Sequence, residues 1–174
     1  PLWTVAAGSV FAIIIVKQLF GGIGDNFLNP ALTARAVLLA SWPALMTTHL
    51  APAVFPATDA VASATPLATG GYTAMQLLLG QTPGAIGETC KIAVLVGFVF
   101  LLLTGTVSWR IPTVTVLSAF VIAWALKMDP FSAVLSGGLL FGAVFMATDY
   151  TTSPMHPLPQ TLYAVGIGVM TILI

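Results

Sequence analysis

A short run of small and hydroxyl-bearing residues, Ser63-Ala64-Thr65-Pro66, offers the clearest chemistry in this sequence. Pro66 biases the preceding residue towards an extended backbone, so the Thr65 hydroxyl does not fold back onto a helical carbonyl. The small neighbours Ser63 and Ala64 leave room for a bulky group at that oxygen. The run therefore predicts an accessible hydroxyl suited to ester formation, and the competing interpretation is a simple capping turn.

The chain around this run is almost continuously apolar. Hydrophobic residues make up 58% of the sequence and charged residues 6%, whereas soluble domains carry about 25% charged residues. This composition predicts an integral membrane protein. The formal net charge is zero, so no basic face is available for nucleic acid, and we exclude that class of partner. The single cysteine, Cys90, cannot hold an iron–sulfur cluster by itself, so any such cluster belongs to a partner.

Thr65 lies in the connection of residues 47–71, which we expect on the outer side of the membrane. No Lys or Arg occurs between Arg35 and Lys91, whereas cytoplasmic loops carry an excess of these residues. His49 in the same connection has no second His or Cys at ligand spacing, so we assign no metal.

Two polar segments interrupt the apolar sequence. In the first, Asn26 and Asn29 follow three glycines; in the second, Thr148 and Asp149 precede a proline-rich run. Irregular polar backbone is tolerated at membrane depth only where it lines a cavity. We expect both breaks on the same side, where they converge on a ligand. Capping of a broken helix is the alternative for the asparagines, and Asp149 has two alternatives, an ion pair with Arg35 or a cation route. Arg35, a cation on an apolar helix, is expected to pair with Asp25, its nearest acid in the sequence.

These segments occur in the order found in the NqrB/RnfD family, which the chain resembles along essentially its whole length. The matching residues are Gly21-Gly22-Ile23-Gly24-Asp25-Asn26-Phe27-Leu28-Asn29-Pro30-Ala31, the Ser63–Thr65 run, and Met146-Ala147-Thr148-Asp149-Tyr150-Thr151-Thr152-Ser153-Pro154. The family includes RnfD of the Rnf electron-transport complex and NqrB of the sodium-pumping NADH:quinone oxidoreductase.

The resemblance implies two flavins. Thr65 matches the threonine that carries FMN through a phosphoester bond, and Ser63 is its only close substitute. A noncovalent riboflavin is implied near Asn26 and Asn29. The implied partners are other Rnf membrane and peripheral subunits with iron–sulfur clusters and flavins. Ferredoxin and NAD are the implied end reactants, coupled to sodium or proton movement across a prokaryotic inner membrane.

The expected fold is an all-α integral membrane protein, a polytopic helical bundle with broken or re-entrant helices. Residues 1–174 form one transmembrane domain, which we expect to be the central part of a longer chain with an inverted repeat, as the resemblance implies. Spanning length predicts about five crossings and one partial helix at 72–79. The crossings fall at residues 2–20, 31–46, 88–104, 111–126 and 131–146, and another begins at 161.

Local signals set several details of these helices. Asn29 caps the helix that begins at Pro30, and Asp129 caps the helix that begins at Pro130. Glu88 and Lys91, three residues apart, are expected to pair on one helix face. The glycines at 137, 138 and 142 are expected to form a small-residue seam for a neighbouring helix.

Three other functions compete with an Rnf-type electron-transfer subunit. One is an NqrB-type protein with a quinone acceptor. Another is a solute channel, suggested by Asn29-Pro30-Ala31; channels of the aquaporin kind need a second such triplet, and the sequence has none. The last is a scaffold without a cofactor, which would leave the hydroxyl run and the convergent polar groups without a purpose.

Overall fold

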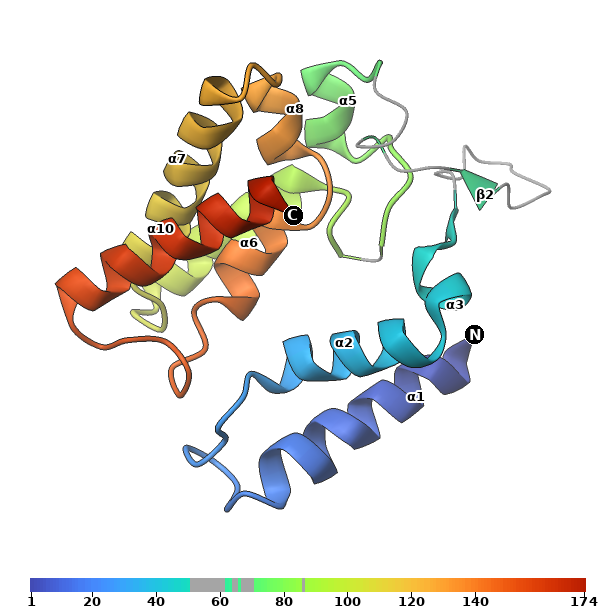
Figure 1. Ribbon diagram of the computed structural model, residues 1–174, viewed down its shortest axis with the longest axis vertical. Coiled ribbons are helices and arrows are strands. Elements are labelled where there is room, and N and C mark those ends of the chain that lie inside the picture. The colour runs from blue at the N-terminus through green and yellow to red at the C-terminus, as the bar shows by residue number, and fades with distance from the viewer. Residues whose placement is uncertain (51–61, 64–65, 67–70, 86) are drawn as a thin grey trace.

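The computed structural model describes residues 1–50, 62–63, 66, 71–85 and 87–174. The described residues are mostly helical. An N-terminal helix pair lies beside a bundle formed by the helices between residues 74 and 173 (Figure 1). The expected all-α character is therefore confirmed for most of the described chain.

The first apolar run forms one helical rod that ends at a glycine turn. Helix α1 (Leu2–Val10) continues into the π-helical segment η1 (Phe11–Gln18). Gly21, Gly22 and Gly24 then have φ values of 119°, 97° and 95°, which residues with a Cβ rarely adopt. The glycines thus reverse the chain and return it along η1 as helix α2 (Pro30–Ser41).

Helix α2 is shorter than expected. We predicted a helix from residue 31 to about residue 46, but α2 ends at Ser41 and a separate helix, α3 (Pro43–Thr47), follows. Trp42 between them has φ −136° and ψ 64°. Pro43 lacks an N–H group and disfavours the helical conformation of the residue before it, which explains the break.

One short pair of strands departs from the all-α expectation. Strands β1 (His49–Leu50) and β2 (Ala62–Ser63) are antiparallel, with His49 opposite Ser63 and Leu50 opposite Ala62. Two-residue strands are too short to produce the alternating pattern that identifies a strand in a sequence. The pair joins the chain on either side of residues 51–61. Ala64 and Thr65 lie outside the described residues.

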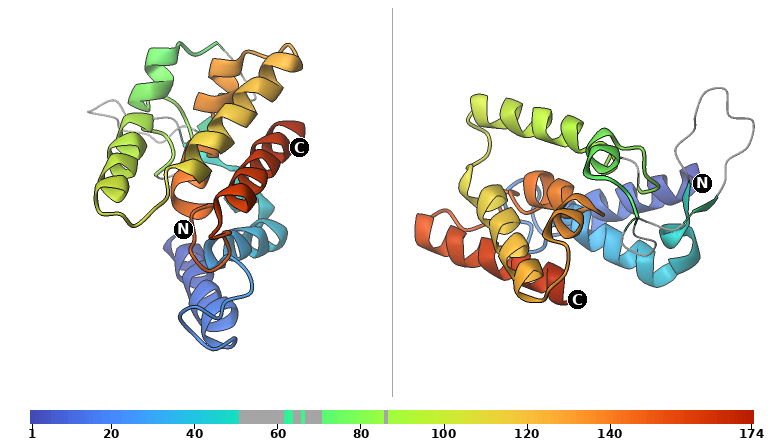
Figure 2. Two further views of the ribbon diagram at one scale, coloured as in Figure 1. Left: turned by 90° about the vertical axis from the view of Figure 1, so that its left-hand side faces the viewer. Right: turned by 90° about the horizontal axis from the view of Figure 1, so that it is seen from above.

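The bundle is built on two long helices that pack against each other. Helix α7 (Arg110–Ala125) lies along α10 (Pro157–Leu173), and both views in Figure 2 keep them side by side. Helix α6 (Lys91–Leu103) and the short α5 (Ala74–Leu79) complete the bundle. Thr73 and Gln76 form a capping box at the start of α5, which is as short as predicted. Buried residues from α6 and the 139–147 region join α7 and α10 in the core.

The expected helix over 131–146 is divided into three pieces. Helix α8 (Pro130–Leu135) ends before Gly137, whose φ is 63°, and α9 (Leu139–Phe141) then leads into the π-helical η2 (Gly142–Met146). Gly137 and Gly138 therefore break the helix instead of forming a seam along it. Asp129 caps α8 as predicted, and hydrogen bonding from Ser132 lowers the pKa of its carboxyl group.

Helix length in this structure differs from the length predicted from the apolar runs. Among the described residues, no helix combines the length and apolarity required to cross a membrane. The expected set of about five spanning helices is therefore not confirmed by the individual helices.

Candidate functional site

The Asn29 side chain connects the two polar breaks. Its Oδ1 accepts a hydrogen bond from the Leu32 amide at 3.1 Å and so caps α2. Its Nδ2 donates to the Met146 carbonyl oxygen at 2.9 Å, across 117 residues of sequence. The capping interpretation is confirmed for Asn29, and the two breaks meet as predicted. A ligand role for Asn29 remains a prediction.

Asn26 makes a local contact. Its side chain is 7% exposed, and its Nδ2 donates to the Leu28 carbonyl oxygen at 3.0 Å. This bond holds the loop that leads into α2. A ligand role for Asn26 also remains a prediction.

Thr148 and Asp149 shape the second break. The Thr148 hydroxyl donates to the Val144 carbonyl oxygen at 2.6 Å. The Asp149 carboxylate accepts hydrogen bonds from the Thr151 hydroxyl at 3.0 Å and the Thr152 hydroxyl at 2.9 Å. These bonds order the turn after η2, and the role of both residues at a ligand site remains a prediction.

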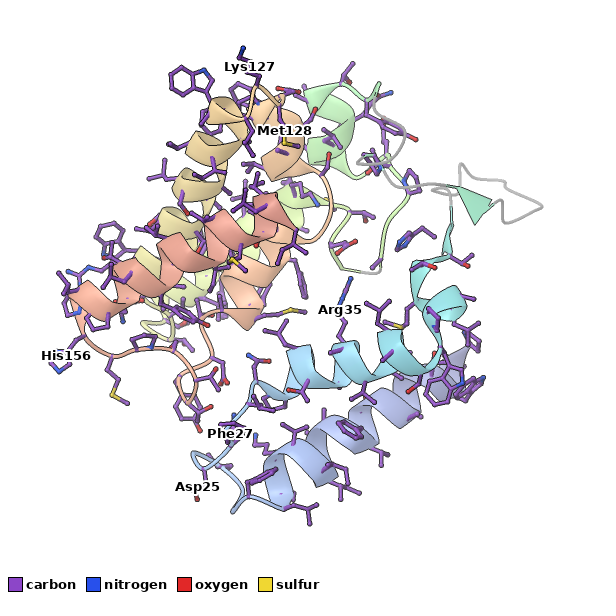
Figure 3. The ribbon with its side chains drawn as sticks, in the orientation of Figure 1. Asp25, Phe27, Arg35, Lys127, Met128 and His156 are labelled. Atoms are coloured by element: carbon purple, nitrogen blue, oxygen red, sulfur yellow. The ribbon has the colours of Figure 1, made fainter. Side chains whose placement is uncertain are left out.

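Arg35 lies apart from the acids that were expected to pair with it. We considered Asp25 the nearest partner and Asp149 an alternative, and among the described residues no ion pair involves Arg35. Asp25 sits at the glycine turn, while Arg35 points from α2 towards the bundle (Figure 3). The expected pairing is wrong because half the length of α2 separates Arg35 from the glycine turn.

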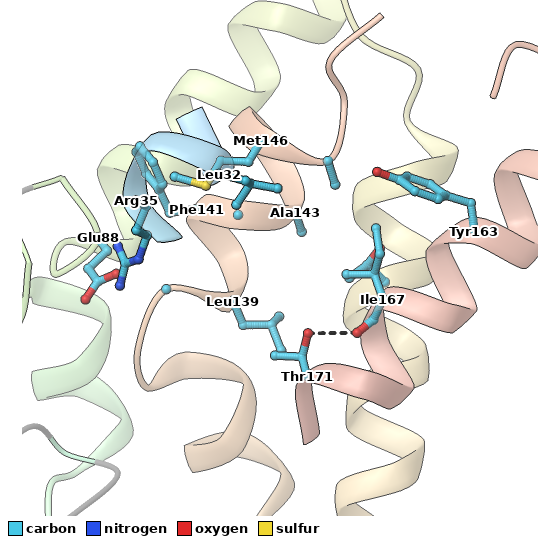
Figure 4. Close-up of a pocket in the computed structure, with 14 residues that line it drawn as sticks. Leu32, Arg35, Glu88, Leu139, Phe141, Ala143, Met146, Tyr163, Ile167 and Thr171 are labelled. Atoms are coloured by element: carbon cyan, nitrogen blue, oxygen red, sulfur yellow. Dashed lines mark hydrogen bonds between the residues drawn. The ribbon is translucent and has the colours of Figure 1, made fainter. Parts of the chain in front are cut away.

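Arg35 instead lines a cavity of about 390 Å³ between α2 and the bundle (Figure 4). Most of the wall is apolar and comes from α2, α9, η2 and α10. The polar groups on the wall are Arg35, Glu88, Thr115, Tyr163 and Thr171. The volume is within the range of about 300–1,000 Å³ that is typical of small-molecule sites.

Thr115 contributes an unsatisfied hydroxyl to this cavity. The residue is 1% exposed, and its Oγ1 has no hydrogen-bond partner among the residues that the structure describes. Buried polar groups normally have a partner, and leaving one unsatisfied costs about 1–3 kcal/mol. Sequence reasoning missed Thr115, because a threonine within an apolar helix carries no distinguishing signal.

Glu88 and Lys91 do not pair as expected, because Glu88 precedes the helix that Lys91 begins. The Lys91 ammonium group donates to the backbone carbonyls of Glu88 and Gly137, the latter at 2.7 Å. The Glu88 carboxylate accepts from the Ala85 amide at 3.0 Å. Lys91 therefore joins the start of α6 to the break between α8 and α9. A cation at a helix N-terminus opposes the helix dipole, which was a usable signal for this role.

The bond from Asn29 to Met146 leads to a stability prediction. The Asn29→Asp variant keeps an oxygen to cap α2 but loses the Nδ2 donor and places a carboxylate against the Met146 carbonyl. We expect a loss of about 1–3 kcal/mol, measured by thermal unfolding in detergent. Asn29→Ser, which keeps the cap without adding charge, should lose less. An Asn29→Asp variant as stable as the native protein would show that this bond does not hold the two breaks together.

Comparison with known proteins gives one family and several relatives. A family model described as the NQR2, RnfD, RnfE family matches residues 1–174. The chain is 47% identical over 183 residues to one subunit of the Na⁺-translocating ferredoxin:NAD⁺ oxidoreductase complex of Acetobacterium woodii, covering 100% of this chain and 57% of that protein. It is 37% identical over 196 residues to the corresponding subunit of the proton-translocating ferredoxin:NAD⁺ oxidoreductase complex of Clostridium ljungdahlii, covering 100% and 59%. It is 39% identical over 200 residues to one subunit of the Na⁺-translocating NADH-quinone reductase of Chromohalobacter salexigens, covering 100% and 47%. The chain thus spans about half the length of these relatives.

Proposed function

The chain belongs to the NQR2, RnfD, RnfE family, and from this premise we propose that it is a membrane subunit of an ion-translocating oxidoreductase complex. The Rnf type is favoured, with ferredoxin and NAD as the end reactants. The observation that carries this choice is the 47% identity, along the whole chain, to the relative from a ferredoxin:NAD⁺ oxidoreductase complex. The 39% identity to a component of NADH-quinone reductase supports the alternative, an NqrB-type protein in which a quinone is the acceptor.

The first cofactor is FMN, attached to Thr65 through a phosphoester bond. Support comes from the sequence, in which Ser63 and Ala64 leave the hydroxyl accessible. Covalent attachment in the connection of residues 47–71 holds this flavin at the outer face of the membrane. The flavin supplies the electron-transfer chemistry, and the chain fixes its position.

The second cofactor is a noncovalent flavin, riboflavin, bound where the two polar breaks meet. The residues present are compatible with it. The cavity has ligand-sized volume, an apolar wall for a ring, and the unsatisfied hydroxyl of Thr115. Met146, which accepts the bond from Asn29, lies on the cavity wall. Asn26, Thr148 and Asp149 hold the loops at the two breaks, so their role is to position the wall.

The remaining parts of the complex are proposed by analogy with the relatives. They are membrane and peripheral subunits that carry iron–sulfur clusters and flavins. Partner subunits must supply the iron–sulfur clusters, because the single Cys90 cannot hold a cluster. The proposed location of the protein is therefore the inner membrane of a prokaryote.

The test is an assay of the assembled complex, purified through a tag on the full-length protein and placed in sealed vesicles. We expect reduction of NAD⁺ by reduced ferredoxin, together with uptake of sodium or protons. Both activities should be absent from preparations that lack this protein. Oxidation of NADH by quinone, without ferredoxin activity, would select the NqrB-type alternative. Passage of a neutral solute, with no redox activity, would select a channel and refute the proposal.

A further inference from the structure

The charge around the cavity is not balanced. Arg35 and Glu88 lie on the cavity wall, and the Lys91 ammonium group, buried at 3% exposure, donates to the backbone carbonyl of Glu88 beside it. These two cations and one carboxylate leave one net positive charge, and no ion pair to Arg35 occurs in the ranges that the structure describes. Figure 4 shows its guanidinium group on the same side of the cavity as Glu88. The cavity therefore favours a bound group that carries a negative charge.

We propose that Arg35 stabilises the reduced, negatively charged form of a redox ring held in this cavity and so raises its reduction potential. The inference rests on the proposed function, which supplies the ring. Two electrons and one proton convert a neutral oxidised ring into a reduced ring with one negative charge. The electrons come from an upstream redox centre of the complex. A flavin and a quinone share this chemistry.

The physical reason is the attraction between opposite charges. This attraction varies inversely with the dielectric constant, so it is stronger beside the mostly apolar wall than in bulk water. Arg35 is an exposed residue of α2 that lines the cavity, and the bond between Asn29 and Met146 joins the start of α2 to the end of η2. The helix that carries the cation is therefore positioned at the cavity before reduction occurs.

Thr115 is proposed to bind the same ring by a hydrogen bond in both redox states. Within the described part of the chain, its hydroxyl is a buried polar atom on the cavity wall that has no hydrogen-bond partner. A ring carbonyl or nitrogen would accept its proton. The Thr115 hydroxyl therefore increases the affinity for the ring in both redox states, whereas Arg35 increases the affinity for the reduced ring alone.

The experiment compares retention of the ring by the purified complex in oxidised buffer and in buffer reduced with dithionite. Acid precipitation releases the noncovalent ring and leaves covalent FMN with the protein; chromatography of the released fraction and of a solvent extract distinguishes flavin from quinone. We expect Arg35→Gln to weaken retention of the reduced ring about tenfold relative to the oxidised ring. For a two-electron couple this is a shift of about 30 mV to lower potential. Arg35→Lys should keep most of the preference.

Two control variants separate this role from general damage. Arg110 stacks on Trp109 at 5.8 Å and is absent from the cavity wall, so Arg110→Gln should behave as the wild type. Thr115→Val removes the hydroxyl at similar size; retention should fall several-fold in both states, with no change in their ratio.

Two results would overturn the inference. An Arg35→Gln complex that contains the ring and keeps the wild-type ratio would overturn the role of Arg35. Equal losses in both redox states would do the same, because they indicate a packing role. A wild-type complex that releases neither flavin nor quinone would instead overturn the proposed second cofactor, and this inference with it.

Discussion

The Thr65→Ala variant should lose all covalent flavin from this protein. An ester bond requires a side-chain oxygen, and alanine has none. After co-expression with the flavin transferase, the wild-type protein should give a fluorescent band on a denaturing gel under ultraviolet light. The variant band should be dark, with protein staining unchanged. The expected effect is complete loss, because the bond either forms or does not form.

Matched variants of the same run make this test specific. Ser63 carries the other hydroxyl close to Thr65, and it lies in β2, paired with His49 across the short sheet. The Ser63→Ala variant should keep its fluorescence, because the acceptor at Thr65 is unchanged. A fluorescent Thr65→Ala band would place the attachment elsewhere. A dark wild-type band, in a host where another flavinylated protein fluoresces, would refute covalent FMN in this chain.

The Gly168→Ala variant should strongly destabilise the helix bundle. A Cβ added at Gly168 would overlap the Ser118 hydroxyl oxygen and would lie 2.6 Å from the Thr115 carbonyl oxygen and 2.9 Å from the Ala119 amide nitrogen. The Ser118 side chain can rotate, but the two backbone atoms are fixed in α7. Helix α10 must therefore move away from α7 to admit a single methyl group.

The expected cost of this variant is about 3 kcal/mol, at the upper end of the usual range for overpacking. For a protein of this size, that loss lowers the midpoint of thermal unfolding by roughly 6–12 °C. The control is Gly166→Ala, two residues earlier on the same helix, where an added Cβ meets nothing within 4 Å. Gly166→Ala should be neutral or slightly stabilising, because alanine favours the helix. Equal melting curves for the two variants would show that α7 and α10 do not pack as closely as described.

Helix caps and turns depend on residues that are close together in the sequence, and these features could be predicted. Asn29 and Asp129 were identified as caps because each precedes a proline at the first helical position, and both predictions are confirmed. The glycine turn after η1 was predicted for a similar reason, since a run of glycines interrupts an apolar helix. Local geometry requires only the residues within one or two turns, and the sequence shows these directly.

The same local reasoning failed where two local signals conflicted. The apolar run through Trp42 favoured a continuous helix, but the constraint from Pro43 prevailed and ended α2. The glycines at 137 and 138 suit a close helix contact as well as a helix break. The bond from Lys91 to the Gly137 carbonyl holds the break, and 46 residues separate the two.

From the sequence alone we inferred an apolar composition typical of membrane proteins and the resemblance to the NqrB/RnfD family. The sequence also identified the hydroxyl of Thr65 as the attachment site to test. These follow from composition and from residue order, which require no coordinates. Only the tertiary structure decided that Asn29 binds Met146, that Arg35 lines a cavity away from Asp25, and that the Thr115 hydroxyl is buried with no partner among the described residues. The physical reason is that these contacts join residues far apart in the chain, and their geometry is the combined result of packing every helix at once.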